Sequence, residues 1–334
     1  MMQYLLAVCV PTYNRSSFLE DLLCVVAPIC SKYNVEICIS DNNSPDDTQA
    51  VVGKYIKLYP NIAYYKQLTN IGADDNFEYV LKMAHSKYRW LMADTCYIDE
   101  ESLIQTLEDL KTADLDALIV NGAENRARYL PEKEQVYNDS RELMRTIGWH
   151  LTWISCLIYK DDLVNSTNFT RFRHSSFNQT GIVFETLANR PCNVKFNPQI
   201  IVEAFKMEKE SGWQDMVFKI FCQDWYLFVM SLPIFYSFDD KTKCIKDSSR
   251  KAVVLSLRMH AKRRSQNKWN LKSFFQYHYF IRQTLPNTWI IFLIGLVPAI
   301  IWKYIFLIGK KLKQKLKIVS TLMYFFIIIY GWKR

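Results

Sequence analysis

The 334-residue sequence has no C-x-x-C pair among its nine cysteines, and its five histidines never stand at zinc-site spacing. These absences exclude a disulfide framework and a structural zinc site, so a reducing, cytosolic setting is expected. The start also lacks a charged segment followed by an apolar stretch and a small-residue cleavage site, so no secretory signal is predicted. Half of the residues are apolar, which argues against disorder and predicts a sizeable core.

Acidic residues are scarce in the C-terminal part of the chain. From Lys241 onward there are twenty Lys and Arg residues against one acid, Asp247, so this part carries +19 while residues 1–240 carry −10. Two long apolar segments, 289–308 and 318–332, flank the basic stretch "GKKLKQKLK". Because a phosphate-binding surface seldom alternates with runs of Ile, Phe and Trp, this pattern favours an anionic membrane surface over nucleic acid as the partner.

Neither apolar segment is suited to crossing a bilayer. The second has about fifteen residues, fewer than the roughly twenty that a bilayer core needs, and the first contains Pro298 and Lys303. If both segments crossed, the lysine-rich stretch between them would lie on the far side, against the preference of such loops for the cytoplasm. We therefore expect a peripheral or monotopic arrangement at the cytoplasmic leaflet. The alternative is a helical hairpin buried against the rest of the protein.

The first part of the chain alternates between strand-like and helix-like segments. The predicted strands are Leu5–Val10, Val35–Ser40, Ile62–Lys66, Arg89–Ala93 and Leu115–Asn121. This βαβα order predicts an α/β fold with a mostly parallel sheet covered by helices. Ligands of such sheets collect beyond the carboxyl ends of the strands, so the loops there are expected to carry the function.

Polar side chains fill those loops, "VPTYNR", "ISDNNSPDDT" and "LTNIGADDNF". In the second loop, Ser44, Pro45 and Asp47 resemble an N-cap, a first-turn proline and a capping-box acid, so Ser44 and Asp47 are assigned a structural role. Asp74 or Asp75 is expected to cap the helix after the third loop. The remaining candidates are Thr12, Tyr13, Asn14, Asp41, Asn43, Asn70, Asn76 and, after the fourth strand, Asp94.

Four segments in this order, "VCVPTYNRSSFLEDLL", "EICISDNNSPDDT", "NIGADDNFEYVL" and "YRWLMADTCYIDEESL", resemble the family 2 glycosyltransferases. The resemblance is strongest to bacterial abequosyltransferase-like members that build O-antigen and capsule sugars. It covers residues 1 to about 120, fades to about 235 and is absent beyond. It implies a GT-A nucleotide-binding domain and a nucleoside diphosphate sugar donor.

The resemblance also implies roles for individual residues. Pro11, Thr12 and Tyr13 would border the nucleotide, and Asp41 would accept a hydrogen bond from the base. Asn43 lies in the same loop as Asp41 and is grouped with it. Asn70 and Asn76 would lie near the ribose or the sugar.

Asp94 occupies the first place of the family's D-x-D triplet, which holds a divalent cation beside the diphosphate. Here the triplet reads Asp94, Thr95, Cys96, so the second carboxylate is missing. One carboxylate with phosphate oxygens and waters binds Mg²⁺ or Mn²⁺ more weakly than two. A metal ion at Asp94 is therefore expected to bind weakly, or activity is expected to survive chelation. Asp99 and Glu100 are assigned to the start of the following helix.

Inverting transfer requires a general base for the acceptor hydroxyl. The stretch "RHSSFNQTGIVFETLAN" is similar to a family segment that carries a histidine shortly before the glycine, but Gln179 stands there in this chain. His174 and Glu185 are the catalytic candidates that remain, and each also has a structural interpretation as a surface or capping residue.

Together with the resemblance, the sequence predicts three regions. Residues 1–120 form the nucleotide-sugar-binding half of a GT-A domain, 121–240 its acceptor-side half, and 241–334 a basic, apolar, helical region that associates with the membrane. The predicted function is inverting sugar transfer to a lipid-linked saccharide in bacterial surface polysaccharide synthesis, at the cytoplasmic face of the inner membrane. The competing class is a catalytically impaired sugar-nucleotide-binding or scaffolding protein. A nucleotidyltransferase is disfavoured because "PTYNRSS" is not a glycine-rich, lysine-bearing loop.

Overall fold

The computed structural model describes residues 4–122, 127–205 and 212–310. Its strands are β1 (Tyr4–Thr12), β2 (Glu36–Asp41), β3 (Ile62–Lys66), β4 (Ser86–Leu91), β5 (Cys96–Ile98), β6 (Ala117–Gly122), β7 (Gln135–Tyr137), β8 (Leu157–Lys160) and β9 (Val194–Ala204). Its helices are α1 (Ser16–Lys32), α2 (Thr48–Ile56), α3 (Ala73–Met83), α4 (Glu100–Thr112), α5 (Ser140–Ile147), α6 (Asp161–Ser166), α7 (Asn178–Thr186), α8 (Trp225–Ser231), α9 (Phe238–Lys251), α10 (Leu257–Ser265), α11 (Leu271–Gln276), α12 (His278–Thr284) and α13 (Thr288–Leu296). A further helix spans 299–310, and η6 (Lys219–Asp224) is a π-helix before α8.

One sheet organises the described part of the chain, with strands in the order β3-β2-β1-β4-β8-β6-β9-β5 and with β7 paired to β9. The first four strands pair in parallel, as the βαβα pattern predicts. The expectation of a mostly parallel sheet does not extend further, because β8 runs antiparallel to both β4 and β6. β9 is parallel to β6 and antiparallel to β5 and β7.

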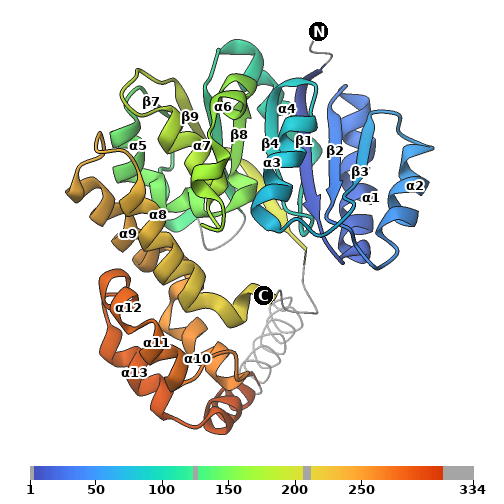
Figure 1. Ribbon diagram of the computed structural model, residues 1–334. Helices are drawn as coiled ribbons and strands as arrows, with labels where there is room; N and C mark the ends of the chain where they lie inside the picture. The colour runs from blue at the N-terminus through green and yellow to red at the C-terminus, as the bar shows by residue number, and fades with distance from the viewer. Residues whose placement is uncertain (1–3, 123–126, 206–211, 311–334) are drawn as a thin grey trace, which may run out of the picture.

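Buried apolar runs explain the first half of the sheet. Residues 6–10 of β1 and residues 37–39 of β2 have no exposed surface, as expected for parallel strands covered on both faces. Helices α3, α6 and α7 pack against one another on one face (Figure 1). The carboxyl ends of β1 to β4 therefore emerge at a single edge of the sheet.

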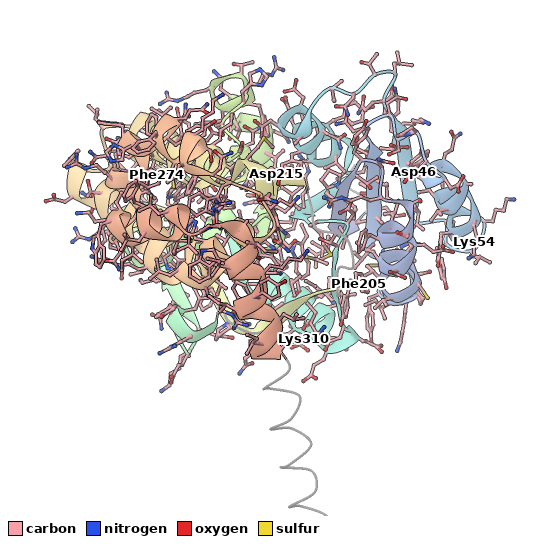
Figure 2. The ribbon with its side chains drawn as sticks, turned by 90° about the horizontal axis from the view of Figure 1, so that it is seen from below. Asp46, Lys54, Phe205, Asp215, Phe274 and Lys310 are labelled. Atoms are coloured by element: carbon pink, nitrogen blue, oxygen red, sulfur yellow. The ribbon has the colours of Figure 1, made fainter. Side chains whose placement is uncertain are left out.

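The C-terminal helices form a second apolar core. It is made of Val217, Phe218, Cys222, Leu255, Ala261, Trp269, Phe274, Ile281, Leu285, Ile291 and Ile294. Helix α9 joins it to the sheet, and begins with a capping box of Ser237 and Asp240. Figure 1 shows these helices on the side of the molecule at which β1 ends, and Figure 2, seen from that side, places Phe274 and Asp46 at opposite flanks with Phe205 and Asp215 between them.

Helix α13 and helix 299–310 carry the first apolar segment. In the described residues no single helix has both the length and the apolar character to cross a bilayer; only these two together meet that test, and they are bent by 98°. The bend lies at Val297 and Pro298. One face is buried in the second core through Ile291 and Ile294, but many apolar side chains stay exposed: Trp289, Leu293, Leu296, Ile300, Ile301, Tyr304, Ile305, Leu307 and Ile308. The second apolar segment, 318–332, and most of the basic stretch lie outside the described residues.

Candidate nucleotide-sugar site

Four loops meet where strands β1 to β4 end. Thr12 is in register with Asp41 of β2, and the Asn42 N–H donates to the Thr12 carbonyl at 2.9 Å. The Gln67 N–H, after β3, donates to the Asp41 carbonyl at 2.8 Å, and the Met92 N–H, after β4, donates to the Cys9 carbonyl at 2.9 Å. The sheet thus brings the residues singled out in three loops, and the Asp94 loop, to one edge.

Asp94 is held by two side chains from the β1 loop. The Arg15 guanidinium donates to its Oδ1 at 2.9 Å, and the Thr12 hydroxyl donates to its Oδ2 at 2.9 Å. Asp94 is buried, whereas one third of the Arg15 side chain is exposed. Burial raises the pKa of the Asp94 carboxyl, and the Arg15 guanidinium and the Thr12 hydroxyl oppose that rise. The ion pair therefore offsets the cost of an ionised carboxylate in a buried position.

The expected metal site at Asp94 does not fit this donor set. Both carboxylate oxygens already accept hydrogen bonds, and Cys96, in the third place of the triplet, is buried in β5. In the part of the chain that the structure describes, no three His, Cys, Asp or Glu side chains gather into a group able to hold a metal ion. A divalent cation at Asp94 would share the carboxylate with the positive charge of Arg15, which opposes its binding.

Asp41, the predicted partner of the base, has no exposed surface. Its Oδ1 accepts from the Ser44 N–H at 2.7 Å and its Oδ2 from the Tyr64 hydroxyl at 2.8 Å. Burial and the Asp41 carboxylate raise the pKa of Tyr64, which keeps that phenol protonated as a donor. In this arrangement Asp41 shapes the loop, and its contact with a base stays a prediction.

The three predicted asparagines differ in exposure. Asn76 is buried, where it accepts from the Ser40 hydroxyl at 2.6 Å and donates to the Ser40 carbonyl. Asn70 is exposed and accepts from both Asn42 and the Gly72 N–H, which closes the turn before α3. Asn43 is exposed and has a φ of 63°. Asn76 thus lies behind the loop surface, while Asn43 and Asn70 reach it.

Tyr13 and Pro11 lie on either side of Thr12. Pro11 is buried within β1, while the Tyr13 ring is 45% exposed at the sheet edge. The β1 loop thus supplies an exposed aromatic ring and, two residues later, the positive charge of Arg15. That pairing suits a base joined to a diphosphate.

The predicted helix caps in these loops are wrong. Helix α2 begins at Thr48 with no side-chain cap from Asp47, and the Ser44 hydroxyl instead accepts from the Asn14 N–H at 2.9 Å. The carboxylate of Asp46 instead accepts from the Thr48 N–H at the start of α2 and from the Ser16 N–H at the start of α1. The local pattern could not reveal this, since Ser16 is 30 residues away.

Asp74 and Asp75 do not cap α3 either. Its N-cap is Gly72, whose φ of 87° favours glycine. Asp74 accepts from the Ser176 N–H at 3.3 Å, and Asp75 pairs with Arg173 at 2.8 Å. Both acids therefore tie α3 to a distant segment.

That segment, 173–176, contains His174 in an exposed position with a φ of 63°. Burial raises the pKa of Asp74, an effect opposed by hydrogen bonds from the backbone of Ser176 and His174. The Ser176 hydroxyl donates to Asp224 of η6 at 3.3 Å, and Lys219 pairs with the same carboxylate at 2.8 Å. His174 is thus brought beside the loop that follows β3.

Glu185 lies elsewhere. It is near the end of α7 and pairs with Arg171 at 3.0 Å. Gln179, at the place of the family's histidine, is buried in α7 and donates weakly to the Thr152 carbonyl at 3.4 Å. The structure records contacts to the third loop for His174 and none for Glu185 among the described residues.

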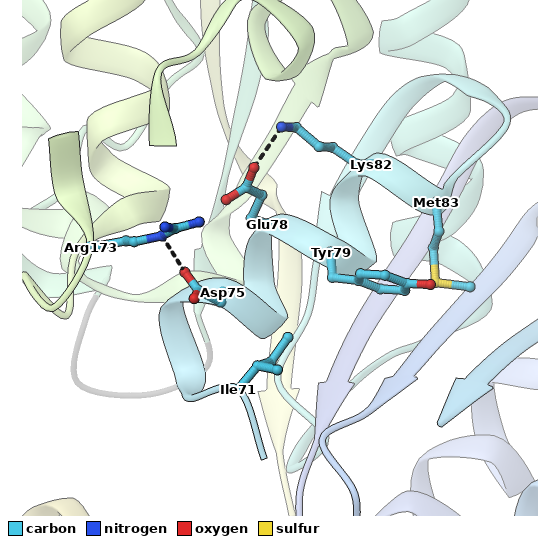
Figure 3. Close-up of a pocket in the computed structure, with 7 residues that line it drawn as sticks. All are labelled: Ile71, Asp75, Glu78, Tyr79, Lys82, Met83 and Arg173. Carbon is cyan, nitrogen blue, oxygen red and sulfur yellow. Dashed lines mark hydrogen bonds and ion pairs between the residues drawn. The ribbon is translucent and has the colours of Figure 1, made fainter. Parts of the chain in front are cut away.

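A pocket of about 560 Å³ lies on the outer face of α3 (Figure 3). It is lined by Ile71, Asp75, Glu78, Tyr79, Lys82, Met83 and Arg173. Its charged groups are already paired, Asp75 with Arg173 and Glu78 with Lys82. Asp94 and Arg15 do not line it, so this pocket is separate from the sheet edge at which the four loops meet.

Known proteins are similar to this chain in both sequence and fold. Residues 7–166 match the family model described as glycosyl transferase family 2. Abequosyltransferase RfbV of Salmonella typhimurium is 29% identical over 185 residues, which cover 49% of this chain and 55% of that relative. The chain thus spans about half the length of this relative.

Two solved structures share the fold. TarS of S. aureus (residues 1–349), in complex with UDP-GlcNAc, superposes with a TM-score of 0.58 at 16% identity, covering 85% of this chain and 82% of that one. The mannosyltransferase PcManGT of Pyrobaculum calidifontis, in complex with GDP-Man and Mn²⁺, has a TM-score of 0.53 at 12% identity, covering 88% of each chain. The order of the motifs, the sheet and these matches agree: residues 7–166 match glycosyl transferase family 2, and the chain has the α/β fold of the GT-A glycosyltransferases.

Proposed function

We propose that this protein is an inverting glycosyltransferase that takes a sugar from a nucleoside diphosphate donor. The observation that carries the proposal is the convergence of the four loops at one sheet edge, where Tyr13 is exposed and the partly exposed Arg15 and the buried Thr12 both donate to Asp94. Tyr13 offers its ring to the base, and Arg15 offers charge-assisted donors to the diphosphate. The relatives bound to UDP-GlcNAc and GDP-Man support this class of donor.

In the proposed reaction, an acceptor hydroxyl attacks the anomeric carbon from the face opposite the diphosphate. The bond between that carbon and the phosphate oxygen breaks, the diphosphate leaves with the electron pair, and a base takes the hydroxyl proton. His174 is the better placed of the two candidates, since it is exposed beside the third loop. Glu185 is engaged by Arg171 and remains the second candidate.

We propose a lipid-linked saccharide as the acceptor and surface polysaccharide synthesis as the setting. The similarity to an abequosyltransferase supports this class of acceptor. The exposed apolar face of α13 and helix 299–310 supports it independently, because such a face matches the interior of a bilayer better than water. The five lysines of residues 310–317 continue the same chain and suit anionic headgroups.

The membrane surface in this proposal is the cytoplasmic face of the bacterial inner membrane, with the chain peripheral or monotopic. The C-terminal helices lie on the side of the molecule at which β1 to β4 end. Docking through these helices therefore holds the proposed donor site near the leaflet that contains a lipid-linked acceptor.

The competing candidate is a protein that binds a sugar nucleotide without transferring the sugar. The observations that favour it are Thr95 and Cys96 in place of the triplet's acids and Gln179 in place of the family's histidine. Purified protein incubated with a panel of UDP-, GDP-, CDP- and dTDP-sugars distinguishes the two. Release of nucleoside diphosphate from one donor supports transfer. Loss of that release in His174→Gln and its retention in Glu185→Gln support His174 as the base. Binding of a donor without release in the presence of lipid extract supports the competitor.

A further inference from the structure

The Arg15 guanidinium contacts the carboxylate that the family resemblance assigns to a divalent cation. It lies 2.9 Å from Asp94, the first carboxylate of the triplet. Among the described residues this is the only hydrogen bond that the Arg15 side chain makes, so four of the five guanidinium N–H groups have no protein partner. Arg15 is also the residue that precedes α1, at whose start partial positive charge gathers.

A metal ion competes poorly for this site. It meets the positive charge of Arg15 at Asp94, and the triplet offers it no second carboxylate, because Thr95 follows Asp94 and the Cys96 side chain is buried in β5. The Thr95 carbonyl is also engaged, since it accepts from the Phe205 N–H at 2.9 Å. The missing second carboxylate of the triplet and the Arg15 guanidinium at Asp94 both disfavour a metal ion at this site.

Few other cations are available in the four loops. Their sequences contain one basic residue, Arg15, and the nearest lysine in the chain before the third loop is Lys66, the last residue of β3. Lys66 donates to the Ser44 carbonyl at 3.1 Å, on the Asp41 side of the site. Arg173 and Lys219, in the neighbouring segment, are paired with Asp75 and Asp224. Among the described residues of these loops, Arg15 is therefore the basic side chain that contacts Asp94.

We propose that Arg15 is a built-in cation that binds the donor's diphosphate in place of a divalent metal ion, with Asp94 and Thr12 fixing its position. This inference rests on the proposed function, since it assigns the diphosphate of that donor to a residue. Asp94 then acts as a positioning residue for Arg15. A planar guanidinium with several free donors matches two phosphate oxygens at once, which Lys at this position would not do.

Calorimetric titration in EDTA tests the metal-free part of the proposal. UDP, GDP, CDP and dTDP and their four nucleosides are titrated into the full chain, first with EDTA and then with Mn²⁺. We expect one diphosphate to bind in EDTA at least about tenfold more tightly than its nucleoside, the size of one charge-assisted contact. Diphosphate binding that is lost in EDTA and restored by Mn²⁺ overturns the proposal.

Substitution of Arg15 tests the residue itself. Arg15→Met should weaken diphosphate binding by about tenfold or more and leave nucleoside binding unchanged, while Arg15→Lys should retain part of the advantage. The control is Arg190→Met, which removes an arginine of similar exposure that pairs with Asp116. Melting curves with and without nucleoside identify any variant that fails to fold, in which case Arg15→Lys and the EDTA titration decide.

The results separate this inference from the function on which it rests. Equal diphosphate affinity in Arg15→Met and wild type overturns the role of Arg15 and leaves the glycosyltransferase proposal intact. Absence of binding by every diphosphate and nucleoside, with and without Mn²⁺, overturns both.

Discussion

The nucleotide-side loops bury polar side chains, whereas the C-terminal helices expose apolar ones. In the loops, the buried polar groups Asp41, Asn76 and Asp94 each accept a hydrogen bond from a side chain of another segment of the chain. In the C-terminal helices, apolar side chains such as Ile301 and Ile305 remain exposed. The first region uses its hydrogen bonds to fix a geometry, whereas the second leaves a surface without a partner.

The contrast teaches where each kind of specificity lies. A site for a small polar ligand needs groups fixed by their neighbours, and the loops provide that. A membrane-facing surface needs only an apolar area and positive charge, so its exact side chains matter less. Substitutions in the two regions should therefore affect different measurements.

The largest effect is expected from Asp94→Ala. Without the carboxylate, Arg15 loses its anchor, and a misplaced charge at the diphosphate should lower turnover of the donor by about 100-fold. Nucleoside binding should stay within a few fold, and partition into membranes should not change. The measurement is the rate of nucleoside diphosphate release. A variant with wild-type turnover contradicts the role given to Asp94.

The paired change Ile301→Glu with Ile305→Glu should have the opposite profile. A fully buried isoleucine contributes about 1.5 to 3 kcal/mol on leaving water, so the pair should weaken partition into anionic vesicles by about thirtyfold or more. Donor hydrolysis in detergent should be unchanged. The matched control is Ile56→Glu with Leu58→Glu, two exposed apolar residues on the nucleotide side. Equal loss of binding in test and control pairs contradicts a membrane surface at the C-terminal helices.

The stability of the C-terminal helices should depend on pH through His260. This side chain is fully buried against Phe218 and Trp269, and burial lowers the pKa of His260 to about 3, with Arg263 adding to the effect. The unfolded chain therefore binds a proton between about pH 6.5 and 3 that the folded chain does not, so stability is present above that window and falls as pH falls.

We expect wild type to lose about 1 to 2 kcal/mol of unfolding free energy between pH 6.5 and 5 from this group, and His260→Phe to lose less. Urea unfolding at several pH values provides the measurement. At pH 8 the histidine is neutral in both states, so any difference there reports packing alone. An unchanged pH slope in the variant contradicts the assignment.

The smallest effect is expected from Tyr64→Phe. The change removes one donor to the buried Asp41 carboxylate and should cost about 1 to 2 kcal/mol of stability, with a weakening of nucleotide binding of a few fold. Tyr65→Phe is the control, because its exposed ring stacks on Tyr79 and its hydroxyl interacts with that tyrosine and not with a buried carboxylate. Equal stability of the two variants contradicts a supporting role for Tyr64.

The fold of the first part of the chain was predictable because its signals are local. Buried apolar runs mark β1 and β2, and polar loops follow them, so parallel order and the ligand edge follow from the pattern. The antiparallel insertion of β8 between β4 and β6 was not predictable, because pairing between residues so far apart in the sequence leaves no periodic signal.

The sequence identified several residues of the site but not the hydrogen bonds and ion pairs between them. Asp94 and Thr12 were candidates from their loops, but the Arg15–Asp94 pair joins residues 79 positions apart and was missed, although the missing triplet acids hinted at a different cation. Asp46 was missed for the same reason. Local capping rules assigned Ser44 and Asp47 because they consider one helix, whereas Asp46 serves two.

The pairing of β5 with β9 has a consequence for how the protein is made. β5 directly follows the Asp94 loop, and in the described residues its strand partner is β9, with the Phe205 N–H closing on Thr95. During synthesis, the loops of β1, β2 and β4 can assemble about 110 residues before β9 leaves the ribosome, which corresponds to roughly 5 to 20 s at roughly 5 to 20 residues per second. The strand that follows the Asp94 loop therefore gains its partner only after the loops of the nucleotide edge can have formed. An emerging chain holds this edge incomplete until β9 closes it.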